Sequence, residues 1–410
     1  MQQMITGLIH HPYTPPAGFA APQPAVHKAS TVIFPNVAAM RSTEWKDKTG
    51  FTYGLHGTPT TYMLEERLAT LEGGLQCLLV PSGLAAVALV ALAVLKTGDE
   101  VLIPDNAYGP NKALAEAELV GWGISHRYYD AMNPQDLRDK ISKQTRLVWV
   151  EAAGSVTLEF PDLPELVRIC KAAKVICALD NTWGAGLAFK PFDLAPGPRA
   201  EPALPASPAL GVDISVHALT KYPSGGGDVL MGSVITRDQA LHLKIKLTHM
   251  RLGLGVAGND AEGVLRALPS IMLRYRAHDA ATRELARWAQ TRPEFAQVLH
   301  PALTDSPGHA HWKALCQPGP GTAAGLFSVI FHADHPSAKV DAFCDALKLF
   351  KLGYSWGGPM SLVVPYDLAS MRSGWPSGLA RGTLVRFSIG LEDVADLQAD
   401  LAQALTRAFG

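Results

Sequence analysis

Helical and strand-like patterns alternate along the chain from Leu64 onward, and this alternation limits the fold more than any other feature. The helical pattern YMLEERLATLEGG is followed by the apolar run QCLLV, and that run by the helical pattern LAAVALVALAVL. The same order continues to the run KVICALD, which ends at Asp180. Strands separated by helices form a mostly parallel sheet with helices on both faces. The sequence therefore predicts an α/β fold.

The two ends of the chain depart from this alternation. Residues 1–60 combine Pro and Gly with short apolar pieces and lack periodicity, so we expect an extended arm that contacts a neighbouring subunit. We assign residues 61–290 to a large α/β domain, with the Pro/Ala-rich stretch Ala195–Gly211 as a surface excursion. Residues 291–410 mix strand-like runs such as GLFSVIF with helical runs such as DVADLQADLAQAL, which predicts a smaller α+β domain.

Charge balance and cysteine usage exclude several classes of protein. Lys plus Arg number 36 and Asp plus Glu 37, which argues against a nucleic-acid binder and leaves small molecules or copies of the chain as partners. The five cysteines are scattered without a CxxC pair, so we expect no disulfide framework, no metal site and a cytoplasmic protein. The N-terminus shows no signal peptide. The uncharged stretch Cys77–Leu95 is divided by Pro81-Ser82-Gly83, which indicates a strand and a buried helix, not a membrane span.

Four groups with chemical potential follow predicted strands. In parallel α/β sheets, ligands collect at the carboxyl ends of the strands. The turn VPSGLAA places Gly83 and Leu84 at a helix start, where free backbone N–H groups suit a phosphate. Tyr108 follows the run EVLI, Asp180 ends KVICALD, and Lys221 lies just beyond VDISV. We expect these groups to meet at one edge of the sheet.

Each of these groups has an ordinary structural interpretation when it is taken singly. Tyr108 suits a half-buried packing position, Asp180 suits a helix N-cap and Lys221 suits a solvated loop. Together, the turn, the aromatic ring, the acid and the lysine are what pyridoxal phosphate requires. The lysine bonds to the cofactor, the acid keeps the pyridine nitrogen protonated, the ring stacks, and the turn holds the phosphate. Pyridoxal 5'-phosphate is therefore the predicted cofactor.

Longer stretches connect these groups between Tyr53 and the C-terminus. They read YGLHGTPTTYMLEERLATLEGG, VPSGLAAVAL, GDEVLIPDNAYGP, DNTWGAG, HALTKY, YSWGG and TLVRFSIGLEDVADLQADL. In this order they resemble the cysteine/methionine-metabolism family of pyridoxal-phosphate-dependent enzymes. The resemblance implies the aspartate-aminotransferase-like fold (fold type I), with a mostly parallel seven-stranded sheet and a smaller C-terminal domain. It also implies dimers with shared active sites that assemble into homotetramers.

The resemblance assigns roles at the cofactor. Lys221 in LTKY would bond covalently to the cofactor and move protons between Cα and the leaving group. Asp180 in DNTW would pair with the pyridine nitrogen and strengthen the electron sink. Tyr108 in NAYGP would stack on the ring and assist proton transfer. The residues implied for the phosphate are Gly83, Leu84 and Thr220, with Tyr53 reaching the phosphate of the neighbouring subunit.

Substrate-binding residues follow in the same way. Arg386 in LVRFSIG would hold the substrate α-carboxylate with its planar fork, a task suited to arginine. Ser355 and Trp356 in YSWGG would line the carboxylate end of the site.

Two positions depart from the family pattern. The phosphate-binding arginine of the family's YGRRGT-like stretch is Leu55 here, and the adjacent His56 has a structural interpretation. The small residue three before the lysine, often serine in the wider family, is Ala218. Both changes remove polar contacts to the phosphate, so we expect weaker retention of the cofactor than is usual in the family.

The expected chemistry is β-elimination at a sulfur amino acid. With L-cystathionine the products would be homocysteine, pyruvate and ammonia, a step of methionine biosynthesis. Trp183 in DNTW and the YSWGG stretch resemble the β-lyase branch more than the γ-branches. γ-Lyase and γ-synthase activities of the same family stay open, as does β-elimination of cystine or cysteine conjugates. A non-catalytic pyridoxal-phosphate-binding protein is the alternative from another class.

Overall fold

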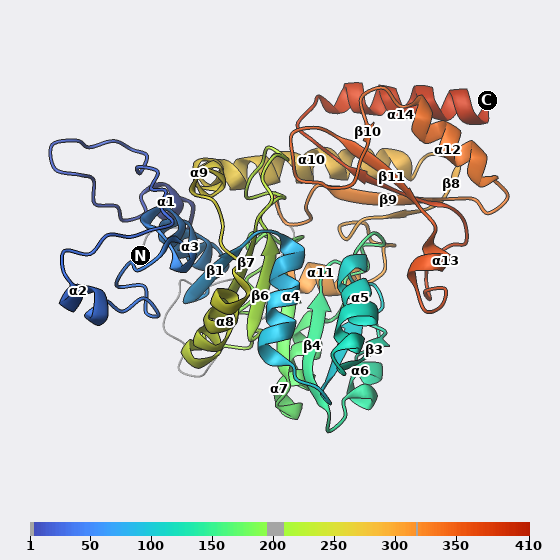
Figure 1. The fold of residues 1–410 in the computed structure, drawn as a ribbon. Coiled ribbons are helices and arrows are strands. Elements are labelled where there is room, and N and C mark those ends of the chain that lie inside the picture. Colours follow the sequence, from blue (N-terminus) through green and yellow to red (C-terminus); the bar gives the residue numbers. More distant parts are fainter. Residues whose placement is uncertain (1–3, 195–208, 317–318) are drawn as a thin grey trace.

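Two β-sheets organise the computed structural model, which describes residues 4–194, 209–316 and 319–410 (Figure 1). The larger sheet has seven strands in the order β1-β7-β6-β5-β4-β2-β3. Their bounds are β1 (Gln76–Val80), β2 (Glu100–Pro104), β3 (Ser125–Tyr129), β4 (Thr145–Glu151), β5 (Ile176–Asp180), β6 (Ile214–Ala218) and β7 (Gly232–Thr236).

This sheet is parallel except at one strand. The pairs β2–β3, β2–β4, β4–β5 and β5–β6 are parallel, whereas β7 runs antiparallel to both β1 and β6. The parallel strands are almost continuously apolar and buried, as expected for a sheet covered on both faces. The predicted mostly parallel, seven-stranded sheet is confirmed.

Helices precede, connect and follow the strands. Their bounds are α1 (Met4–Ile9), α2 (Val37–Ser42), α3 (Pro59–Glu72), α4 (Gly83–Val94), α5 (Gly109–Leu114), α6 (Pro134–Lys140), α7 (Leu163–Ala173), α8 (Gln239–Leu252), α9 (Gly258–Ala267), α10 (Ile271–Ala289), α11 (His309–Cys316), α12 (Ser337–Ala346), α13 (Leu368–Met371) and α14 (Val394–Phe409), with short turns η1 (Gly54–His56), η2 (Ala115–Leu119) and η3 (Leu268–Ser270). Helix α3 starts at a capping box between Thr58 and Thr61 and ends at Gly73, whose φ of 79° favours glycine.

The apolar helix α4 is buried between the sheet and α8, which explains why its sequence is apolar on every side. Among the described residues, no helix combines the length and apolar character needed to cross a bilayer. The Pro/Ala-rich stretch that we expected at the surface lies mostly in residues 195–208, outside the described residues.

The second sheet has five strands in the order β10-β11-β12-β9-β8, and a separate apolar core packs between it and α10, α12 and α14. Its strands are β8 (Phe295–Leu299), β9 (Leu326–Phe331), β10 (Lys351–Leu352), β11 (Leu362–Tyr366) and β12 (Leu384–Ser388). Only β9 and β12 coincide with strands that we predicted. In Figure 1 this sheet lies beyond one edge of the large sheet, with α12 and α14 on its outer side.

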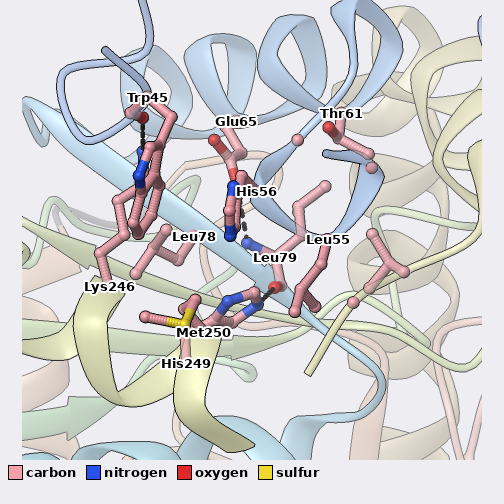
Figure 2. Close-up of a pocket in the computed structure, with 14 residues that line it drawn as sticks. Trp45, Leu55, His56, Thr61, Glu65, Leu78, Leu79, Lys246, His249 and Met250 are labelled. Atoms are coloured by element: carbon pink, nitrogen blue, oxygen red, sulfur yellow. Dashed lines mark hydrogen bonds between the residues drawn. The ribbon is translucent and has the colours of Figure 1, made fainter. Parts of the chain in front are cut away.

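The N-terminal arm contains two short helices, α1 and α2. We did not predict them, because the sequence of the arm lacks periodicity. Lysine side chains attach the end of the arm to the body of the protein. Lys246 Nζ on α8 donates a hydrogen bond to the Trp45 carbonyl at 2.8 Å, and Lys48 Nζ lies 2.6 Å from Glu65 Oε2 on α3. The Trp45 ring stacks on His56 with centroids 4.0 Å apart. These two residues and Leu55 line a small pocket, which is shown in Figure 2.

A buried polar network ties α3 to the middle of the large sheet. Glu72, at the end of α3, accepts hydrogen bonds from Ser215 on β6 and from Asn181 Nδ2 beyond β5. His217 Nδ1 on β6 lies 2.7 Å from Glu72 Oε1, and the side chains of both residues are fully buried. His217 lies on the strand that leads to Lys221, and Asn181 directly follows Asp180, so this network adjoins the chain segments that carry both residues.

Replacing Glu72 with alanine should destabilise the protein by about 3 kcal/mol, because His217, Ser215 and Asn181 then lose a buried partner. The matched control is Glu66→Ala, which removes an exposed carboxylate from the same helix and should cost less than about 0.5 kcal/mol. Urea unfolding at one protein concentration measures both. Equal midpoints for the two variants would contradict this role of Glu72.

Candidate active site

The largest group of predicted site residues meets in one cavity of about 460 Å³ at the carboxyl ends of the parallel strands. The large sheet forms its floor, and residues of the second sheet and its loops close the opposite side. The pocket in Figure 2 has room for about 20 Å³, roughly one water molecule, and lies elsewhere. The cavity between the sheets is therefore the candidate active site.

All but one of the residues predicted for the site line this cavity. They are Gly83, Leu84, Tyr108, Asp180, Thr220, Lys221, Ser355, Trp356 and Arg386. Tyr53 is the exception, because it lies on the arm with a side chain that is 47% exposed and with its backbone bridged to Thr31. Its predicted role depends on a second subunit and stays a prediction.

Lys221 projects into the cavity from the loop after β6. Its Nζ donates a hydrogen bond to Ser355 Oγ at 2.8 Å and lies 5.5 Å from the centre of the Trp356 ring. Burial, assisted by the charge of Arg386, lowers the pKa of Lys221 to about 8, while Asp180 acts in the opposite direction. A sizeable fraction of this amine is therefore neutral near physiological pH and can act as a nucleophile or a base.

Asp180 ends β5 at the floor of the cavity. Its Oδ1 accepts hydrogen bonds from Thr182 N at 3.0 Å and from Thr182 Oγ1 at 2.5 Å. Burial raises the pKa of Asp180, whereas the Thr182 donors and the nearby His217 lower it. Within the described part of the chain no basic side chain forms an ion pair with this carboxylate, so a cationic ring nitrogen suits it as a partner.

Arg386 on β12 points into the cavity from the second sheet and is only 7% exposed. Its Nη2 lies 3.5 Å from the Ser355 carbonyl, its guanidinium is 5.4 Å from the centre of the Tyr366 ring, and its Nε lacks a hydrogen-bond partner among the described residues. A buried cation with an unsatisfied donor is costly unless an anion binds to it. The α-carboxylate of an amino acid fits this requirement.

The start of α4 supplies the expected anion site. Ser82 caps the helix by accepting a hydrogen bond from Ala85 N. Gly83 and Leu84, the first residues of α4, line the cavity, and N–H groups at a helix start have no partner within the helix and suit an anion. A Cβ atom on Gly83 would lie 2.6 Å from the Cβ of Ala218, so only glycine allows this close approach of the turn to β6. Together with the acid and the lysine, this turn fits pyridoxal phosphate.

The lining residues that were not predicted for the site include Glu151, Thr182 and Tyr366. Glu151 ends β4 as Asp180 ends β5, so the rule that located Asp180 at a strand end also applies to Glu151. Thr182 follows Asp180 closely enough for its hydroxyl to turn back to the carboxylate. Tyr366 ends β11, a strand that contains Pro365 and that we did not predict.

The comparison with known proteins agrees with this geometry. Residues 5–406 match the family described as Cys/Met metabolism PLP-dependent enzyme, whose cofactor is pyridoxal 5'-phosphate. The chain is 38% identical to the cystathionine beta-lyase of Bordetella avium over 98% of both chains. It is also 32% identical to the L-alanine/L-glutamate racemase of Wolbachia pipientis wMel, over 94% of this chain and 92% of that protein.

A solved structure shows the same fold. The cystathionine gamma synthase of Xanthomonas oryzae pv. oryzae, in complex with cystathionine, superimposes with a TM-score of 0.85 at 28% identity, covering 100% of this chain and 99% of that one. The predicted fold type I architecture is thereby confirmed. The chain belongs to the pyridoxal-phosphate-dependent enzymes of cysteine and methionine metabolism.

Proposed function

We propose that this enzyme is a cystathionine β-lyase, which breaks the Cβ–S bond of L-cystathionine and releases homocysteine, while water hydrolyses the remaining three-carbon fragment to pyruvate and ammonia. The observation that carries the proposal is the bridge that Ser355 makes between Lys221 and Arg386. Its hydroxyl accepts from Lys221 Nζ at 2.8 Å, and its carbonyl lies 3.5 Å from Arg386 Nη2. A base and a carboxylate-binding cation are thus held at neighbouring points of one cavity, as required to bind an α-amino acid and remove its Cα proton.

The side chains of this protein have separate tasks in the elimination. Arg386 binds the substrate carboxylate and directs the Cα–H bond towards Lys221, whose neutral amine removes the proton. Pyridoxal phosphate, when bound, supplies the electron sink that accepts the charge left at Cα. Asp180 holds a proton at the ring nitrogen of the cofactor, since its carboxylate favours the cationic form.

Lys221 also has the right acidity for the second half of the reaction. After it takes the Cα proton, its ammonium can deliver a proton to the departing sulfur. A pKa near 8 serves both steps, because the group exchanges protons readily at neutral pH. Trp356, whose ring lies over the Lys221 amine, limits the access of water to it.

Related proteins are named cystathionine gamma synthase and L-alanine/L-glutamate racemase, so other reactions occur among the relatives of this chain. We favour β-elimination because the Bordetella avium relative named cystathionine beta-lyase is 38% identical over nearly the whole chain. A non-catalytic cofactor-binding protein is disfavoured, since Arg386 and Ser355 form a carboxylate site that such a protein would not need.

We further propose a dimer in which the arm of each subunit completes the site of the other, and a tetramer built from two such dimers. The arm presents large apolar side chains to solvent, with Ile33 91% exposed and Phe19 68% exposed. Such side chains favour contact with a neighbouring subunit. Tyr53, on the same arm, is then available to the phosphate of that subunit.

Product analysis tests the proposed reaction directly. Purified protein, incubated with pyridoxal phosphate and L-cystathionine, should release homocysteine and pyruvate in equal amounts, and Arg386→Ala should lower kcat/KM by at least about 100-fold. Release of cysteine and 2-oxobutyrate would identify a γ-lyase. Absence of both product pairs, with cystine or cysteine conjugates cleaved instead, would reject cystathionine as the substrate.

Introducing arginine at position 55 should strengthen cofactor binding. Leu55→Arg adds a charge-assisted phosphate contact, for which we expect a dissociation constant about tenfold lower by equilibrium dialysis. Leu352→Arg, which adds the same charge at an exposed leucine of β10, is the control and should leave the constant unchanged. An unchanged constant for Leu55→Arg would show that the leucine does not weaken cofactor retention.

A further inference from the structure

We propose that Glu151 is a positioning residue of the cofactor site: in its protonated form it holds the backbone of Tyr108 and leaves the negative charge at the floor of the cavity on Asp180. This role of Glu151 concerns cofactor binding, so it does not depend on which amino acid is the substrate.

The strand register places the two carboxyl groups side by side. Glu151 and Asp180 are the last residues of β4 and β5, which are adjacent parallel strands, and their Cα atoms are register partners. Both side chains line the cavity. Neighbouring parallel strands lie only about 4.8 Å apart, so two acids at one level of the sheet interact strongly where bulk water does not screen them.

The hydrogen-bond donors around the two acids are unequal. Asp180 Oδ1 accepts from both the backbone N–H and the hydroxyl of Thr182. Glu151 Oε2 accepts from the backbone N–H of Tyr108 at 2.8 Å, and this is its one hydrogen-bond donor among the described residues. Hydrogen bonds donated to a carboxylate stabilise its ionised form, so the surroundings favour charge on Asp180.

The surroundings of Glu151 also favour its protonated form. Burial raises the pKa of Glu151 well above its usual range and the adjacent Asp180 raises it further, against smaller effects of the Tyr108 N–H and of Arg372. Arg372, from the loop after α13, is itself paired with Glu159, so its charge is shared. When two neighbouring acids compete for one proton, the acid with fewer donors keeps it. That acid is Glu151.

Tyr108 is the residue that this arrangement positions. Carboxylates also hold the residues just before it: Asp105 accepts hydrogen bonds from Ser373 and Lys112, and Asn106 Nδ2 donates to Glu159 Oε2 at 3.2 Å. Glu151 completes the set at Tyr108, whose ring is 41% exposed and lines the cavity. A neutral acid can hold the Tyr108 N–H with its carbonyl oxygen while adding no second negative charge.

Two variants separate the positioning role from a charge role. In Glu151→Gln the amide oxygen can still accept from Tyr108 N, so we expect a pyridoxal-phosphate dissociation constant within about threefold of the wild-type value. The midpoint of the pH titration of the bound cofactor's visible absorption should move by less than about 0.3 unit. In Glu151→Ala the Tyr108 N–H loses its partner, and we expect cofactor affinity to fall by about tenfold.

Both measurements use the cofactor-loaded protein without substrate, so they do not depend on the proposed reaction. A midpoint that moves down by about one unit or more in Glu151→Gln would show that Glu151 is ionised and would overturn the proposal. Wild-type affinity in Glu151→Ala would overturn the positioning role. If Glu151→Ala does not fold, the titration of Glu151→Gln still decides the protonation state.

Discussion

Removing the Lys221 amine from bulk water is the constraint on which the rest of the site depends. In water this group is almost wholly charged at neutral pH and is neither a base nor a nucleophile. Between the two sheets its pKa falls to about 8, because burial and the charge of Arg386 both disfavour the ammonium form. The surrounding structure must offset the free-energy cost of burying this amine. It must also keep Arg386 out of water and hold both cations close together through Ser355.

The opposite charge lies at the floor of the cavity, on Asp180. The carboxylate of Asp180 accepts hydrogen bonds from the backbone and hydroxyl of Thr182. The buried network of Glu72, His217 and Asn181 ties α3 to β6 and to the residue that follows Asp180, so the strand end that carries the acid is anchored to the large sheet and α3. Arg386 comes instead from the second sheet, so the site is complete only when the two sheets are packed together.

Much of this arrangement could be predicted from the sequence, because the required information is local. The alternation of apolar strands and helices indicates the parallel sheet, and strand ends indicate Asp180, Tyr108 and Lys221. Glu151 was missed although its position is equivalent, because an acid after a strand is common and only the register with Asp180 reveals the pairing. Strands β10 and β11 were missed because one has two residues and the other contains a proline.

The role predicted for Tyr53 depends on a second subunit, because this exposed residue lies on the arm and not among the residues that line the cavity of its own chain. Similarly, the choice between β- and γ-chemistry lies in small differences around a common set of side chains, which no strand pattern encodes. The substrate therefore has to be identified by product analysis, whereas the covalent anchor of the cofactor is identified by mapping one modified lysine.

The role of Lys221 is tested most directly by locating the covalent attachment site of the cofactor. Protein loaded with pyridoxal phosphate is reduced with borohydride, digested, and its peptides are mapped by mass spectrometry. We expect the added pyridoxyl group on the peptide that contains Lys221, and on no peptide of Lys221→Ala. Attachment at another lysine, such as the buried Lys246 of α8, would contradict it.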